Sequence, residues 1–122
     1  MNHRELGKSG VKVSELILGC WSMGGDYFGA VDDSDSVRCI RSSIEAGVDS
    51  FDNAELYGDG RAEEVLGKGI AGTDRSKLTL ISKAWTTHFG KEEMEKACAG
   101  TLRRLGTDYL DVYFLHYPPK EQ

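Results

Sequence analysis

The chain has 122 residues and a mass of 13.4 kDa, which is enough for one domain at most. Its 39% hydrophobic and 29% charged residues are typical of a globular protein, and no apolar run reaches the roughly 18 residues that a membrane-spanning helix needs. The net charge of −5, without a basic stripe, argues against nucleic acid as the main partner.

The first 30 residues are predicted to form a hairpin, a strand and a loop. Residues 4–13 are typical of a short β-hairpin because Gly7 and Gly10 bracket a polar turn. The apolar run at residues 16–21 has the length of a strand. Three glycines then permit sharp turns in a loop: Gly24, Gly25 and Gly29.

Helices and strands are predicted to alternate over the rest of the chain. The helices are expected from about residue 33 to Gly47, at about 60–70 and at 91–105, each with apolar side chains at helical spacing and a glycine at its end. The strands are expected at residues 50–52, 78–83 and 111–116. The last of them stops at Pro118 and Pro119, which cannot donate ladder hydrogen bonds.

This alternation has a period of about 30 residues, the length of one βα unit. It predicts an α/β fold with parallel strands and right-handed crossovers. Two architectures satisfy it: an open doubly wound sheet, or part of a (β/α)8 barrel. A complete barrel takes roughly 250 residues, so this chain offers about four of its eight strands.

Ionisable side chains stand at the carboxyl ends of three predicted strands, where parallel α/β folds bind ligands. Asp52 ends one strand and Tyr57 follows it in the loop, while Lys83 and His116 end the next two. Each residue taken singly is more often structural or solvated than catalytic. Their joint occurrence, one βα period apart, favours a shared site.

Together these four side chains predict a general acid beside a positive charge. A phenol holds its proton at pH 7 because its ordinary pKa is about 10, and a nearby ammonium stabilises the phenolate that remains after the proton leaves. An aspartate would hold the lysine charged, and a histidine can orient a substrate oxygen. Carbonyl reduction needs such a proton donor, and its hydride must come from a cofactor because no side chain supplies one.

Other motifs and metal ligation are not indicated. Residues 58–63 begin like a GxGxxG fingerprint but end in glutamate, so no Rossmann motif is present. The histidines show no ligand spacing with the cysteines, so no zinc site is expected: His3, His88 and His116.

The three cysteines are odd in number and widely spaced, and no apolar segment suggesting a secretory signal follows Met1. Reduced thiols in a cytoplasmic protein are the expectation: Cys20, Cys39 and Cys98.

Three segments carry a resemblance to a known family. Residues 51–58 (Phe-Asp-Asn-Ala-Glu-Leu-Tyr-Gly) resemble the aldo-keto reductase signature around its catalytic Asp and Tyr, and residues 60–67 (Gly-Arg-Ala-Glu-Glu-Val-Leu-Gly) resemble the segment that follows it. Ser82 and Lys83 resemble the catalytic-lysine strand. Residues 102–111, with His116-Tyr117-Pro118, resemble the second signature and the catalytic-histidine strand.

The resemblance implies a (β/α)8 barrel that uses NADPH to reduce aldehydes and ketones. Tyr57 would donate the proton, Lys83 and Asp52 would tune it, and His116 would orient the carbonyl. Weaker implications place Cys20, Trp21 and Asp52 near the cofactor and Trp85, with His116, at the substrate.

The family's members are about twice as long as this chain, so residues 1–122 are expected to be a single partial domain with four strands after a hairpin. Most of the family's cofactor contacts would lie in later strands, so activity of this chain alone is left open. The alternatives are a non-catalytic binding or regulatory half-barrel, similar to potassium-channel β subunits, and an inactive fragment. Exposed strand edges are expected to favour self-association.

Overall fold

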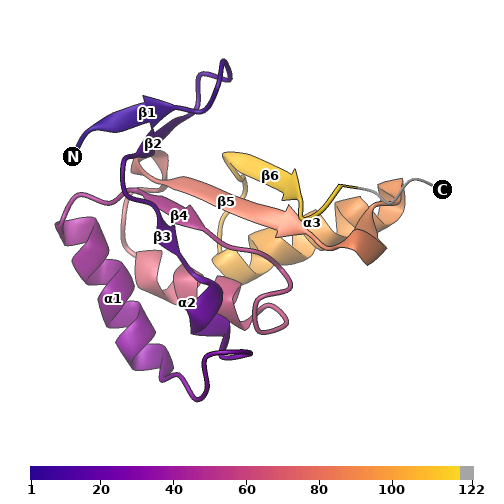
Figure 1. Ribbon diagram of the computed structural model, residues 1–122, viewed down its shortest axis with the longest axis horizontal. Helices are drawn as coiled ribbons and strands as arrows, with labels where there is room; N and C mark the ends of the chain where they lie inside the picture. The colour runs from indigo at the N-terminus through magenta and orange to yellow at the C-terminus, as the bar shows by residue number, and fades with distance from the viewer. Residues whose placement is uncertain (119–122) are drawn as a thin grey trace.

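The computed structural model describes residues 1–118 and has the expected α/β order (Figure 1). Its strands are β1 (His3–Glu5), β2 (Lys12–Ser14), β3 (Leu18–Gly19), β4 (Ser50–Asp52), β5 (Thr79–Ala84) and β6 (Val112–Leu115). Its α-helices are α1 (Asp33–Glu45), α2 (Arg61–Ile70) and α3 (Lys91–Leu105). Three short 3-10 helices follow strands or loops: η1 (Trp21–Gly24), η2 (Arg75–Lys77) and η3 (Thr86–His88).

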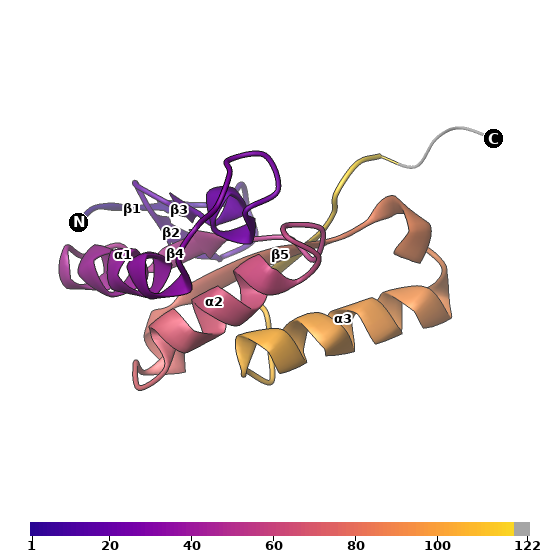
Figure 2. The same cartoon turned by 90° about the horizontal axis from the view of Figure 1, so that it is seen from below.

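Strands β3, β4, β5 and β6 form one parallel sheet in chain order, and β1 and β2 form a separate antiparallel hairpin. Figure 2 shows α1, α2 and α3 side by side on one face of the parallel sheet. The prediction of parallel βα units after an N-terminal hairpin is therefore confirmed.

The hydrophobic core lies between the sheet and the helices. Phe51 of β4 and Leu80 of β5 are fully buried against Leu66 of α2 and Ile40 of α1. Side chains of a strand alternate between its two faces. Asp52 therefore lies on the opposite face from Phe51, away from the helices.

The hairpin contacts the amino-terminal ends of the parallel strands. The Ser14 N–H donates to Ser50 Oγ at 2.9 Å, and Thr79 Oγ1 donates to the Lys12 carbonyl at 2.9 Å. Ligand-binding loops in such folds follow the carboxyl ends of the strands, so the contacts of the hairpin at the amino-terminal ends contribute to stability and not to ligand binding.

The helix ends follow local signals. Asp32 caps α1 by accepting the Ser34 N–H at 2.7 Å. Gly106 ends α3 at φ +67°, a left-handed conformation that favours glycine. Among residues 1–118, no helix combines the length and apolar character needed to cross a membrane.

One expected strand is much shorter than its sequence suggests. Of residues 16–21 only Leu18 and Gly19 pair with β4, while Leu16 and Ile17 are 65% and 42% exposed. The pairing ends where the Cys20 N–H reaches the Asp52 carbonyl, and Trp21 already begins η1. The strand at 50–52 and the helix at 91–105 have the predicted bounds, and the other predicted elements differ from the structure by one or two residues at their ends.

Candidate active site

Lys83 lies at the centre of the charged group at the carboxyl ends of β4 and β5. Its ammonium nitrogen donates to an Asp52 carboxylate oxygen at 2.9 Å, to the Asn53 carbonyl at 2.6 Å and to the Tyr57 hydroxyl at 3.2 Å. A lysine ammonium has three donors and no acceptor. All three donors are therefore engaged, and the lysine is held in one position.

The direction of the Lys83–Tyr57 hydrogen bond decides what Tyr57 can do. Because the ammonium can only donate, the phenolic oxygen of Tyr57 is the acceptor of this bond. Its own O–H hydrogen is left to be donated elsewhere. The ammonium nitrogen also lies 4.9 Å from the centre of the Tyr57 ring, so positive charge is close to the oxygen that would lose the proton.

His116 follows β6 and completes the group. Its ring packs edge-on against Tyr57, with centroids 5.8 Å apart, and its backbone N–H donates to the Ala84 carbonyl at 3.0 Å. Its Nδ1 atom is buried and has no hydrogen-bond partner among residues 1–118. Desolvation, followed by the charge of Lys83, lowers the pKa of His116 below its ordinary 6.5, so the ring is neutral at pH 7.

An open pocket of about 990 Å³ lies beside these residues. Aromatic rings form much of its lining. Trp21 lies 6.0 Å from Tyr57, and Trp85 lies 5.2 Å from His116 and 5.6 Å from Tyr117 between ring centroids. The remaining lining residues are Asp26, Tyr27, Leu56 and Asp59, so no Lys or Arg among residues 1–118 lines the pocket.

A close backbone crossing fixes the loop that carries Tyr57. A methyl group placed on Gly24 would lie 2.5 Å from the Gly58 nitrogen, so only glycine lets the two loops approach this closely. Asp26 adds a hydrogen bond from the Gly58 N–H at 2.6 Å. The loop after β3 thereby holds the residue next to Tyr57.

The structure brings together six of the seven residues predicted for the site and leaves one out. Cys20 is fully buried, and its thiol lies 3.7 Å from the Leu18 carbonyl. Burial, with a smaller contribution from the Asp52 charge, raises the pKa of Cys20 to about 12. The Cys20 side chain thus belongs to the core and does not reach the pocket, because it turns to the helix side of β3.

Sequence reasoning did not single out three residues of this site. Asn53 supplies a carbonyl to Lys83, Glu55 accepts the Trp85 N–H at 2.5 Å, and Tyr117 lines the pocket. Asn53 and Tyr117 each adjoin a predicted residue and lie within segments that resemble the family signatures, and these two signals could have pointed to them. Nothing in the spacing of Glu55 predicts its contact with a loop 30 residues away.

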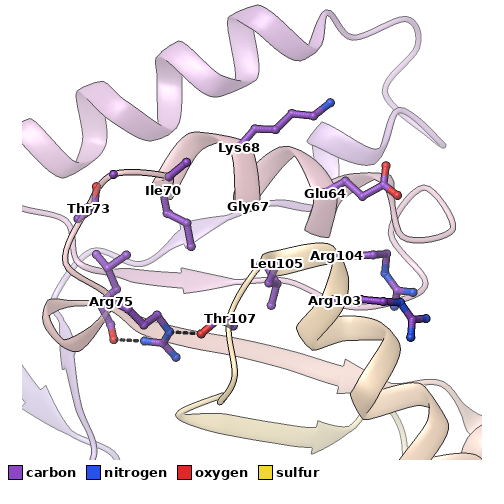
Figure 3. Close-up of a pocket in the computed structure, with 14 residues that line it drawn as sticks. Glu64, Gly67, Lys68, Ile70, Thr73, Arg75, Arg103, Arg104, Leu105 and Thr107 are labelled. Carbon is purple, nitrogen blue, oxygen red and sulfur yellow. Dashed lines mark hydrogen bonds between the residues drawn. The ribbon is translucent and has the colours of Figure 1, made fainter.

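A second cavity, of about 630 Å³, lies at the other end of the molecule between the carboxyl ends of α2 and α3. Figure 3 shows Arg75 there turned toward Thr107. Its guanidinium bonds to Thr107 at 2.9 Å and to Asp111 at 2.8 Å, and Arg104 is paired with the buried Glu63 at 2.6 Å. Arg75 and Arg104 thus make structural contacts, while Lys68 and Arg103 also line the cavity. None of the residues predicted for the site lines it, so this cavity is not the candidate site. No group of three or more possible metal ligands gathers within residues 1–118.

Comparison with known families identifies the chain. The model of the aldo/keto reductase family matches residues 15–122. The chain belongs to this family. The resemblance seen in the sequence is therefore confirmed, and with it the assignment of the four parallel strands to a barrel of the TIM type.

Two curated relatives and one solved structure illustrate the likeness. The methylglyoxal reductase YeaE of Escherichia coli is 42% identical over 99 residues, 81% of this chain and 34% of the relative. A "Probable voltage-gated potassium channel subunit beta" of Arabidopsis thaliana is 35% identical over 97% of this chain and 38% of its own length. An aldo-keto reductase of Klebsiella pneumoniae, solved in complex with NADPH, is 42% identical with a TM-score of 0.80, over 90% of this chain and 37% of that one. The chain thus spans little more than a third of these proteins.

Proposed function

We propose that this chain carries the proton-donating group of an NADPH-dependent reductase of aldehydes and ketones. The observation that carries the proposal is the hydrogen bond that the Tyr57 hydroxyl accepts from the Lys83 ammonium at 3.2 Å, at a residue that lines the aromatic pocket. The Klebsiella relative solved with NADPH supports the choice of cofactor.

The proposed chemistry adds a hydride to the carbonyl carbon and a proton to the carbonyl oxygen. Bound NADPH supplies the hydride. Tyr57 donates its proton as negative charge builds on the oxygen, and the Lys83 ammonium stabilises the phenolate that remains. Asp52 keeps Lys83 in place through their 2.9 Å ion pair. His116, neutral at pH 7, is the hydrogen-bond partner that orients the carbonyl.

The pocket residues fit one end of the cofactor and not the other. Trp21 lines the pocket, 46% exposed beside Tyr57, and offers a flat surface for the nicotinamide ring. The carboxylate of Asp52 is bonded to Lys83 and is not among the lining residues; it is the proposed acceptor for the nicotinamide amide. Trp85 would lie on the substrate side. Within the described part of the chain no Lys or Arg lines the pocket to bind phosphates, so residues 1–118 are proposed to hold only the reacting end of the cofactor.

The test is the rate of NADPH oxidation with benzaldehyde, measured for the 122-residue chain, Tyr57→Phe and Tyr113→Phe. Removing a general acid lowers the rate by about 10² to 10⁴, so Tyr57→Phe should lose turnover. Tyr113 is the matched control because its hydroxyl is buried without a partner among the described residues. Equal activity in Tyr57→Phe and Tyr113→Phe would contradict the proposal.

A second candidate function is a partner-binding module, supported by the likeness to the plant channel β subunit. The two functions share the same fold and differ in whether turnover occurs. A chain that binds NADPH but reduces no carbonyl in the Tyr57 experiment would favour this second function.

We also propose self-association through the outer strands of the sheet. β3 and β6 each have one edge unpaired among residues 1–118, and Phe114 and Leu115 of β6 are both 48% exposed. Unpaired apolar edges favour pairing with another chain. Light scattering should report a mass above that of one chain, and a monodisperse monomer would contradict this.

A cytoplasmic location is proposed from the three unpaired cysteines.

A further inference from the structure

Glu55 joins the two loops that flank the pocket, although it does not line the pocket itself. It lies between Asp52 and Tyr57 in the loop after β4, and its side chain is only 10% exposed. One of its carboxylate oxygens accepts the Trp85 N–H at 2.5 Å and a hydrogen bond from His88 Nδ1 at 2.8 Å. Because a carboxylate only accepts, His88 must carry its hydrogen on Nδ1.

Both partners of Glu55 lie in the loop after β5. Trp85 is the first residue beyond β5, and His88 ends η3. The backbone of Glu55 makes a separate, longer hydrogen bond: its N–H donates to the Lys83 carbonyl near the end of β5 at 3.4 Å. The carboxylate therefore sets where the Trp85 loop leaves the sheet.

The position of Trp85 decides the shape of the pocket wall. Its indole meets His116 edge-on, with an angle of 85° between the ring planes, and meets Tyr117 at 70°. Hydrogen bonds to an ionised acceptor are about twice as strong as neutral ones. The bond from the Trp85 N–H to Glu55 therefore restricts the Trp85 indole to one position beside the His116 ring.

We propose that Glu55 is the positioning residue for the Trp85 wall and thereby sets the affinity for aromatic carbonyl substrates. The effect on substrate rests on the proposed reductase function, whereas the effect on Trp85 does not. Glu55 acts through Trp85, so its loss should raise KM for the carbonyl more than it lowers kcat.

The experiment uses Trp21→Phe as the parent, in which Trp85 is the only tryptophan. Acrylamide quenching of Trp85 fluorescence is compared in Glu55→Ala, Glu55→Gln and Glu95→Ala added to this parent. Glu95 is the matched control because it is exposed on α3. We expect the quenching constant to rise about twofold in Glu55→Ala, to stay near the parent in Glu55→Gln, whose amide oxygen still accepts both bonds, and to be unchanged in Glu95→Ala.

The second readout is KM for benzaldehyde with NADPH, measured with Trp21 intact because Trp21 is assigned to the cofactor. KM is expected to rise about tenfold in Glu55→Ala with kcat within about threefold, because a misplacement of about 1 Å at a site costs up to about 10²-fold. Unchanged quenching and unchanged KM in Glu55→Ala would overturn the proposal. If Glu55→Ala does not fold, Glu55→Met takes its place, because it keeps an unbranched side chain and removes the acceptor of both bonds. Unchanged Trp85 quenching in Glu55→Met would overturn the proposal equally.

The two proposals fail in different ways. An unmodified chain without turnover, when Glu55→Ala still raises Trp85 quenching in the Trp21→Phe parent, would contradict the reductase function and leave the positioning role supported. An unmodified chain with turnover, and no response of Trp85 to Glu55→Ala in the Trp21→Phe parent, would contradict the positioning role alone.

Discussion

The crossing of the loops at Gly24 and Gly58 links the packing of this fold to its candidate chemistry. An alanine Cβ at Gly24 would lie 2.5 Å from the Gly58 nitrogen and 2.7 Å from the Tyr57 carbonyl carbon. Both are backbone atoms and cannot rotate away. Ordinary contact begins at 3.4 Å, so the two loops must separate by about 0.9 Å at this point.

That separation would lengthen the hydrogen bond between Lys83 and Tyr57. The Lys83–Tyr57 bond is already 3.2 Å long, and a further displacement of this size takes it beyond the hydrogen-bonding limit of about 3.5 Å. Overpacking of a tight contact costs about 1–3 kcal/mol of stability. Gly24→Ala is therefore expected to lower both the free energy of unfolding and any turnover that depends on Tyr57.

Urea unfolding followed by circular dichroism measures the stability change, with Gly19→Ala as the control. An alanine Cβ at Gly19 meets nothing within 4 Å and its backbone is not left-handed, so its free energy of unfolding should change by no more than about 0.5 kcal/mol. If Gly24→Ala unfolds at the same urea concentration as Gly19→Ala, the crossing does not constrain the loops and this reasoning is refuted.

Two further predictions concern stability. Arg104→Ala leaves the buried Glu63 carboxylate without its cation and should lower the free energy of unfolding in urea by about 3–5 kcal/mol. Arg103 is exposed, so Arg103→Ala should lower it by no more than about 0.5 kcal/mol. Similar losses in the two variants would contradict the assigned ion pair. Because the pKa of His116 is lowered below 6.5, the unfolded chain binds a proton there before the folded chain does, so stability should fall as the pH drops through 6.5. His116→Gln should weaken this dependence, and an unchanged pH profile would count against it.

The sequence predicted the charged group well because its geometry is carried by strand periodicity. Asp52, Lys83 and His116 stand one βα unit apart at strand ends, and parallel strands deliver such residues to one edge. Cys20 was misplaced because the face toward which a side chain turns depends on register, and β3 pairs with β4 over only two positions.

Contacts between loops lay beyond prediction for a different reason. The bond from Trp85 to Glu55 and the crossing at Gly24 join segments 30 or more residues apart. Their partners are set by how the loops pack in three dimensions, which no local pattern encodes. The glycines of the first loop were noted for their freedom to turn, yet the close approach at Gly24 is what the fold requires of that residue.

The most direct test of the central claim is a fluorescence titration of NADPH into the purified chain and into Tyr57→Phe. We expect saturable binding of similar affinity in both, because Tyr57 is assigned to proton donation and not to holding the cofactor. Absence of saturable binding by the unmodified chain would contradict the claim that residues 1–118 form the reacting end of a working cofactor site.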